Sequence, residues 1–196
     1  MSAANRGRVL RAATRSFLRH GYRSSVDDIA RRAGVAKQTV YHHFPSKDAL
    51  FKEVATGLTA RVLVELGGGA GELRASLVAF GLAYRRRVLG TEGVAMFRTL
   101  TAEVPRFPVL ARALYAGGAG ATVGRLAERL GAAMRAGRLR REEPRFAAEL
   151  LLGMLAGQDR IKRLYGMDGG ARGERRQVTR TVDCFLRAFA VNGGRP

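Results

Sequence analysis

The sequence has little of what metal sites and disulfide-bonded folds require. It contains one cysteine and three histidines, and a single cysteine cannot form a disulfide within the chain. Cys184 lies next to Phe185 on an apolar helical face, where a small core residue is expected. His42 and His43 are adjacent, and successive residues of a helix point about 100° apart, so the two imidazoles are poorly placed to share one ion. We therefore expect neither a metal site nor a cofactor.

Long apolar runs are also missing. No stretch approaches the roughly 18 apolar residues that a membrane-spanning helix needs, and the N-terminus MSAANRGRVL lacks the apolar region of a signal peptide. We see neither an internal repeat nor the alternating pattern of strands. The 196 residues suit one domain or two small ones. These features predict an all-α, cytoplasmic protein that has no membrane partner.

Acidic residues are scarce. The chain has 16 Asp and Glu against 35 Lys and Arg, for a formal net charge of +19, which favours a nucleic-acid partner. However, nearly all the basic residues are arginine, and the chain is rich in alanine and glycine, as in any protein from a GC-rich genome. The first 50 residues carry ten basic against three acidic side chains, and the remainder carries 25 against 13. Because the excess is not confined to one segment, charge alone does not decide the function.

Arrangements typical of enzymes are absent as well. No Ser-His-Asp grouping and no pair of catalytic carboxylates stands out. The glycine-rich run 67–71 follows a helical pattern and lacks the Lys-Ser/Thr of a phosphate-binding loop. We therefore expect no enzymatic activity. A helical enzyme or a metal-binding protein is the alternative from a different class, and it predicts turnover or bound metal.

The most informative stretch present runs from Ser25 to Leu50. Ser25 and Asp28 have the spacing of a capping box, in which each side chain satisfies a free amide at the start of a helix. Gly34 can adopt a left-handed conformation at no steric cost and ends that helix. A second helix, about Lys37 to Phe44, begins within a few residues, so the two must cross steeply. This pattern predicts a helix-turn-helix whose second helix can enter a DNA major groove.

The residues that follow strengthen this interpretation. The run Thr39 to Leu50, TVYHHFPSKDAL, fits the pattern T-[LV]-Y-x-H-F-x-[SN]-K-x-x-L. It resembles the end of the DNA-binding domain in the TetR/AcrR family of transcriptional regulators, and the match extends upstream to Phe17. A weaker similarity joins residues 103–111, EVPRFPVLA, to the ligand-sensing half of one AcrR-like branch. The resemblance implies an N-terminal helix-turn-helix domain and a C-terminal helical domain for ligand binding and dimerisation.

We place the DNA-binding domain at residues 1–50 and the ligand-binding and dimerisation domain at 51–196. The fourth helix continues to about 66, and the glycine run 67–71 marks the boundary. Residues 1–7 have no periodicity and are expected to form a flexible arm. The apolar spacing predicts helices at about 8–20, 46–66, 73–88, 91–100, 109–134, 144–165 and 178–189, the fifth of them softened by the glycines at 117, 118 and 120.

The predicted second helix of the motif supplies candidate DNA contacts. Early side chains of such a helix read base edges, while later ones and those beyond it meet phosphates. Gln38 can pair with adenine, Lys37 with guanine, and the Thr39 methyl can touch thymine or its hydroxyl a phosphate. The family usually places Ser or Thr where this chain has Ala36, and losing such a cap costs about 1 kcal/mol. The predicted DNA-binding residues are Ser25, Lys37, Gln38, Thr39, Tyr41, His42 and Lys47.

The second domain carries candidate ligand contacts. Aromatic and apolar side chains recur on three successive helices, in the region where the family builds its ligand cavity, and two tyrosine hydroxyls could orient a ligand. Core packing is the competing interpretation for each of them. The predicted ligand-binding residues are Phe80, Tyr84, Met96, Phe97, Leu100, Phe107, Tyr115 and Gln158.

Together these observations predict a transcriptional regulator. We expect a repressor that binds a palindromic double-stranded DNA operator as a homodimer, pairs through its last two helices, and is released by a small apolar effector. One alternative is a regulator whose ligand promotes DNA binding. Another is an architectural DNA-coating protein, which would show no operator preference and no ligand response.

Overall fold

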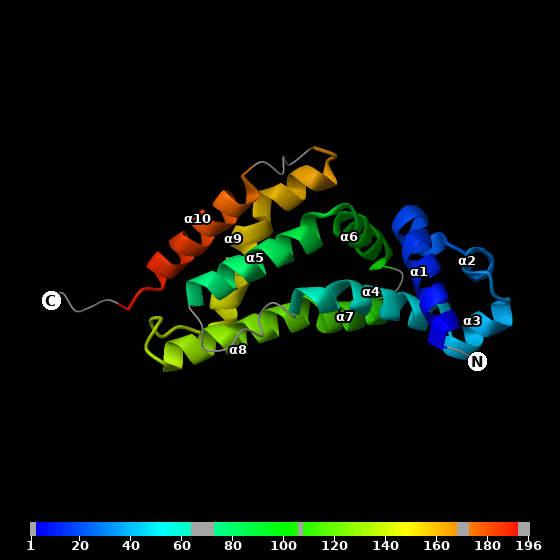
Figure 1. The fold of residues 1–196 in the computed structure, drawn as a ribbon, viewed down its shortest axis with the longest axis horizontal. Coiled ribbons are helices and arrows are strands. Elements are labelled where there is room, and N and C mark those ends of the chain that lie inside the picture. The colour runs from blue at the N-terminus through cyan, green and yellow to red at the C-terminus, as the bar shows by residue number, and fades with distance from the viewer. Residues whose placement is uncertain (1–2, 64–72, 106–107, 168–172, 192–196) are drawn as a thin grey trace. The chain divides into compact units, whose positions relative to one another are not determined.

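The computed structural model describes residues 3–63, 73–105, 108–167 and 173–191. Over these ranges the chain is helical, and no strand occurs in them (Figure 1). No helix in these ranges is both long and apolar enough to cross a membrane. The helical elements are α1 Ala3–His20, the 3-10 turn η1 Gly21–Arg23, α2 Val26–Ala33, α3 Lys37–His43, α4 Lys47–Leu63, α5 Leu73–Leu89, α6 Thr91–Glu103, α7 Pro108–Tyr115, the π-helical turn η3 Ala116–Gly120, α8 Ala121–Arg135, α9 Pro144–Leu164 and α10 Glu174–Ala188.

The helices pack into two compact units, and each unit is discontinuous in sequence. Unit 1 comprises Met1–Thr59 and Thr91–Gly118, and unit 2 comprises Ala60–Gly90 and Ala119–Pro196. Thus α6 and α7 belong with the four N-terminal helices, while α5 belongs with α8, α9 and α10. The glycine run 67–71, which we expected at a domain boundary, lies outside the described residues.

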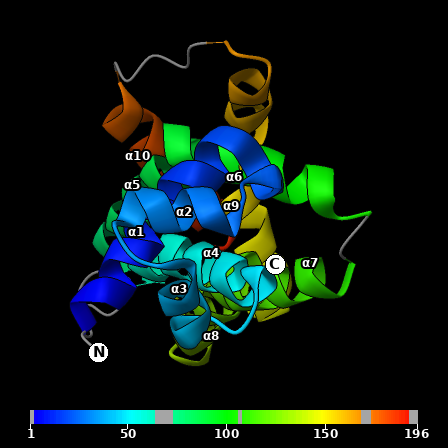
Figure 2. The ribbon, with the colours of Figure 1, turned by 90° about the vertical axis from the view of Figure 1, so that its right-hand side faces the viewer.

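Unit 1 is built around an aromatic cluster that joins α1 to α4. The Phe51 ring meets the rings of Phe17 and Tyr22 edge-on, at centroid distances of 4.9 and 5.1 Å. Met96 of α6 and Leu114 of α7 are buried in the same core. The helix-turn-helix is too small to bury its own apolar face. Helix α1 packs against α2 and α3 and also against α6, which lies behind these helices in Figure 2.

Unit 2 is a bundle of α5, α8, α9 and α10 around a separate core. Phe80, Leu151 and Phe185 are fully buried in it. At Gly81 the bundle leaves no room for a side chain, because an added Cβ would lie 2.7 Å from Cγ1 of Val178. This close approach of α5 to α10 explains why glycine is needed in the middle of α5.

Two expectations about the helices have different outcomes. The flexible arm at residues 1–7 is wrong for the described residues 3–7, because α1 begins at Ala3. Arg6 anchors this extra turn, since its Nη2 lies 2.5 Å from Glu53 Oε1 and its guanidinium carbon lies 5.3 Å from the Phe44 ring centre. The softening expected near residue 117 is confirmed, because a π-helical turn at Ala116–Gly120 joins α7 to α8.

Candidate nucleic-acid interface

The first helix of the motif is fixed at its start by Ser25. Its Oγ accepts a hydrogen bond from the Asp28 amide at 3.0 Å, which confirms the predicted cap. The other half of the capping box does not form, because the Asp28 carboxylate accepts hydrogen bonds from Arg32 and Arg31 instead. These bonds, with that from Arg32 contributing most, hold the pKa of Asp28 below its ordinary value. Asp28 therefore stays ionised in the first turn of α2, where a negative charge is favourable.

The turn between α2 and α3 depends on Gly34. It has φ 64° and ψ 42°, the left-handed conformation predicted from the sequence, and its amide donates to the carbonyls of Ala30 and Arg31. Arg8 of α1 donates from Nη2 to the Gly34 carbonyl at 3.0 Å. The turn is thus held from both sides, which fixes where α3 begins.

Helix α3 presents most of the predicted DNA contacts outward. Val40 is buried in the core of unit 1, while Lys37, Gln38, Tyr41 and His42 are exposed. The seven-residue helix has Ala36 at its N-cap position and therefore no side-chain cap, as its sequence predicts. This exposed face of α3 is what a major groove would meet.

Several of the predicted contacts have specific surroundings. Thr39 is half-buried. Lys37 Nζ lies 3.0 Å from Asp27 Oδ2, and the hydrogen bond to Asp27 raises the pKa of Lys37. The lysine is therefore charged, and it would have to leave Asp27 in order to contact a DNA base.

The start of α4 places Lys47 near the same face. Ser46 Oγ accepts from the Ala49 amide at 3.0 Å and caps this helix, as expected. Lys47 Nζ lies 4.3 Å from the centre of the Tyr22 ring, and the Tyr22 hydroxyl donates to Asp48. The aromatic ring therefore holds the ammonium group at the first turn of α4, where the free amides can also attract a phosphate.

The predicted ligand-binding residues do not gather in one unit. Phe80 and Tyr84 belong to unit 2, where their rings stack with centroids 5.8 Å apart. Arg160 Nη2 donates to the Tyr84 hydroxyl at 3.4 Å, and burial raises the pKa of Tyr84. Gln158 is exposed on α9 of the same unit.

The other members of the set lie in unit 1 or outside the described residues. Met96 is buried in the core of unit 1, and Leu100 packs against that core. Phe97 is half-buried on α6, and Tyr115 at the end of α7 is 55% exposed. Phe107 is not among the described residues. The assignment of these eight residues to a ligand site stays a prediction.

Sequence reasoning missed a buried ionic network around Arg85 in unit 2. Arg85 is 7% exposed, and its Nη1 donates to the Leu155 carbonyl on α9. Its Nη2 lies 2.9 Å from Asp159 Oδ2 and its Nε 3.3 Å from Glu174 Oε1 on α10. The visible signal is Gly157, whose backbone is non-helical and interrupts α9 beside the carbonyl that Arg85 binds.

The two adjacent histidines of α3 were considered above as a possible metal site. The rings of His42 and His43 meet edge-on with centroids 5.3 Å apart. Within the described ranges, no three or more His, Cys, Asp and Glu side chains gather so that they could hold an ion.

Comparisons with known proteins agree with this arrangement. Residues 9–54 match the model of the tetR family of bacterial regulatory proteins. Residues 75–191 match the model of the C-terminal domain of AefR-like transcriptional repressors. YhgD of Bacillus subtilis (strain 168), an uncharacterized HTH-type transcriptional regulator, is 41% identical over 59 residues, which are 30% of this chain and 31% of YhgD. The chain thus matches about a third of that curated relative.

Solved structures extend the similarity to nearly the whole chain. The flavonoid-responsive regulator FrrA is 31% identical, with a TM-score of 0.80, over 98% of this chain and 100% of FrrA. A protein of Mesorhizobium loti MAFF303099, described as a TetR-family transcriptional regulator, is 25% identical with a TM-score of 0.85, over 97% of this chain and 100% of that one. The family models cover both the helix-turn-helix and most of the rest of the chain. This protein belongs to the TetR family of transcriptional regulators, which are DNA-binding proteins without enzymatic activity.

Proposed function

We propose that this protein is a repressor that binds a palindromic operator as a homodimer and leaves it when a small apolar molecule binds. The observation that carries the proposal is the exposed face of α3, which is held rigidly by the Gly34 turn and the buried Val40. The match of residues 75–191 to the C-terminal domain of AefR-like transcriptional repressors supports repression rather than activation.

In this proposal, the side chains of the first turn of α3 contact the bases. The Gln38 amide is exposed and can donate to and accept from one adenine. The Lys37 ammonium can move from Asp27 to the acceptors of guanine, and the half-buried Thr39 can offer its methyl group to thymine. These three side chains give the protein its sequence preference.

Phosphate contacts surround that reading surface. Tyr41 and His42 lie one turn further along α3, and Lys47 lies at the start of α4. Ser25 caps α2, whose free N-terminal amides can bind a phosphate. Such contacts fix the position of α3 in the groove and carry no sequence information.

Dimerisation is supported by an apolar stripe on α9. Phe146, Leu150 and Met154 recur every four residues on one side of α9, and Ile161 follows beyond the interruption at Gly157; the four are 39–51% exposed. Large exposed apolar patches are uncommon on monomers. An added Cβ at Gly157 would meet nothing within 4 Å, so a partner helix could approach closely there. Two-fold pairing of α9 and α10 would bury the stripe in a four-helix interface.

The effector is proposed to be small and apolar. FrrA, which is similar over nearly the whole chain, responds to flavonoids. In this chain Tyr84 is half-buried and stacks on the core residue Phe80, so its ring and hydroxyl group are the parts that could meet a ligand. A ligand releases the protein from DNA only if it binds more tightly to the conformation that does not fit DNA than to the one that does. If the ligand favours the DNA-binding conformation, the protein is the ligand-promoted binder of the alternative.

Selection of bound sites from random-sequence duplexes tests this function. We expect enrichment of a palindrome whose half-sites are centred about 10 bp apart or a multiple of that distance. An architectural DNA-coating protein would enrich no sequence. A site enriched only after an apolar compound is added would identify the ligand-promoted alternative.

A further inference from the structure

Four arginines form a stripe along the outer face of α1. Arg8, Arg11, Arg15 and Arg19 are three or four residues apart, so they share one side of the helix, and all four are exposed. The opposite side carries buried residues such as Phe17. At a rise of 1.5 Å per residue, the stripe extends over about 17 Å.

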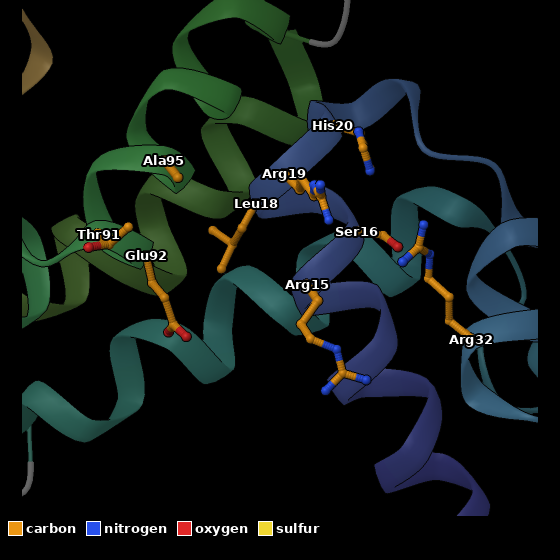
Figure 3. Close-up of a pocket in the computed structure, with 9 residues that line it drawn as sticks. All are labelled: Arg15, Ser16, Leu18, Arg19, His20, Arg32, Thr91, Glu92 and Ala95. Atoms are coloured by element: carbon orange, nitrogen blue, oxygen red, sulfur yellow. The ribbon is translucent and has the colours of Figure 1, made fainter. Parts of the chain in front are cut away.

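Two arginines of α2 widen this stripe into a basic surface. Arg31 and Arg32 line a groove of about 290 Å³ together with Arg8, Arg11 and Arg15. Its neighbour, a groove of about 360 Å³, shares Arg15 and Arg32 and adds Arg19 and His20. The two grooves therefore form one continuous surface, which we call the α1 arginine surface. Figure 3 shows Arg15 and Arg19 on α1 and Arg32 on α2 around the second groove.

Much of the charge on this surface is not neutralised. Arg31 and Arg32 share Asp28, whereas Arg11, Arg15 and Arg19 have no acidic partner within the described ranges. Among the residues that line the two grooves, Glu92 is the one acid. Ser16, 2% exposed, also lines the second groove, and its Oγ has no hydrogen-bond partner there. The surface thus offers several donors to an external anion.

The α1 arginine surface begins next to the start of α3. Arg8 donates to the Gly34 carbonyl, only three residues before Lys37 begins α3. The stripe then leads away from α3 toward the end of α1. Both grooves are open to solvent and lie along an arginine stripe of about 17 Å, which suits a long polyanion better than a small enclosed anion. Duplex DNA carries one charge per about 1.7 Å of its axis, so several phosphates can lie along a surface of this length.

We propose that the α1 arginine surface binds the phosphate backbone of operator DNA beyond the bases that α3 reads. The inference rests on the proposed function, because it assigns the flanks of the same duplex to a second surface of unit 1. Arginine suits this role, since its planar guanidinium can hold a phosphate through two hydrogen bonds. The surface adds affinity and salt dependence but no base preference.

The test compares two duplexes at several salt concentrations. One holds only the selected half-sites, about 20 bp, and the other extends the same sequence by about one helical turn on each side. The full-length protein is compared with a triple variant, Arg11→Gln, Arg15→Gln and Arg19→Gln. A matched control, Arg135→Gln, Arg138→Gln and Arg141→Gln, removes three exposed arginines of unit 2.

We expect the wild-type protein and the control to bind the extended duplex more tightly than the short one and with a steeper salt dependence. The triple variant should lose that gain, with its salt slope on the extended duplex lower by about three per protomer. An unchanged slope would overturn the proposal, as would an equal loss of affinity on both duplexes. If the selection yields no operator, the salt dependence of the triple variant can still be measured on duplexes of arbitrary sequence. Failure of the selection would then count against the proposed function and not against the α1 arginine surface.

Discussion

At the scale of single residues, Ala36 distinguishes α3 from its neighbours. Ser25 caps α2 and Ser46 caps α4, whereas α3 begins without a side-chain cap. A helix of seven residues has little stability of its own, so burial of Val40 and the Gly34 turn must hold it. The exposed side chains of α3 are therefore not needed to stabilise the helix and are available for contacts with DNA.

Gln38→Ala and Lys47→Ala should separate base reading from phosphate binding. Gln38→Ala should relax base preference at one position per half-site, at about 1–3 kcal/mol, because the bidentate contact is lost. Lys47→Ala should weaken binding to all sequences alike and reduce the salt slope by about two per dimer. Titration of both variants against matched and scrambled duplexes at several salt concentrations measures these effects. Interchanged effects would show that the roles are assigned wrongly.

Arg85 shows what one buried charge does in unit 2. It binds the carbonyl at the interruption of α9 and pairs with acids on α9 and α10. Burial opposes ionisation of Asp159, but hydrogen bonds from Arg85 and Gln177 outweigh it, and the pKa of Asp159 lies below its ordinary value. Arg85 therefore links α5 to α9 and α10 through one buried carbonyl and two partly exposed carboxylates.

Arg85→Met should destabilise the protein by about 1–3 kcal/mol, because it leaves the buried Leu155 carbonyl without a donor and removes the partner of two partly exposed carboxylates. Arg74→Met is the matched control on the same helix. Arg74 also pairs with an acid of α10, Asp183, but its side chain is 46% exposed, and such surface pairs contribute about 0–1 kcal/mol. Urea denaturation of both variants measures the difference. Equal losses would mean that the Arg85 network adds no more than a surface pair.

At the scale of elements, local patterns were predictable and long-range pairings were not. Ser25, Gly34 and Ser46 act within a few residues of themselves, so the sequence reveals α2, α3 and the start of α4. The first turn of α1 was missed because its anchor, Glu53, lies 47 residues away. Arg85 was missed for the same reason, since its partner on α10 is 89 residues distant.

The candidate site residues show the same difference between local motifs and long-range packing. The α3 contacts follow from a local motif, and the exposure of Lys37, Gln38, Tyr41 and His42 agrees with it. The ligand set was drawn from helical periodicity, which marks an apolar face without showing what packs on it. Met96 illustrates this limit, because it lies in the core of unit 1 rather than with Phe80 and Tyr84.

The α9 stripe leads to a prediction about assembly. The wild-type protein should sediment as a dimer at micromolar concentration. A double variant, Leu150→Glu and Met154→Glu, should sediment as a monomer, because four charges would be buried against each other in a two-fold interface. Val109→Glu, which changes a 71% exposed side chain on α7 of unit 1, is the control and should stay dimeric. A wild-type monomer, or a double variant that still forms dimers, would exclude this interface.

At the scale of the whole molecule, the order of the units along the chain matters for regulation. The chain leaves unit 1 after Thr59, enters it again at Thr91 and leaves it after Gly118. Helix α6, which packs on α1, directly follows α5 of unit 2 in sequence. Should the proposed ligand alter the packing of α5, α6 is the next helix along the backbone.

In the proposed mechanism, an apolar ligand and the operator bind different conformations of one dimer. The most direct test measures the affinity of the full-length protein for its selected palindrome, with and without flavonoids and fatty acids whose binding is confirmed by calorimetry. We predict that a bound compound weakens operator binding by about a hundredfold, a coupling of roughly 3 kcal/mol. A compound that binds the protein but leaves operator affinity unchanged, or raises it, would contradict the account.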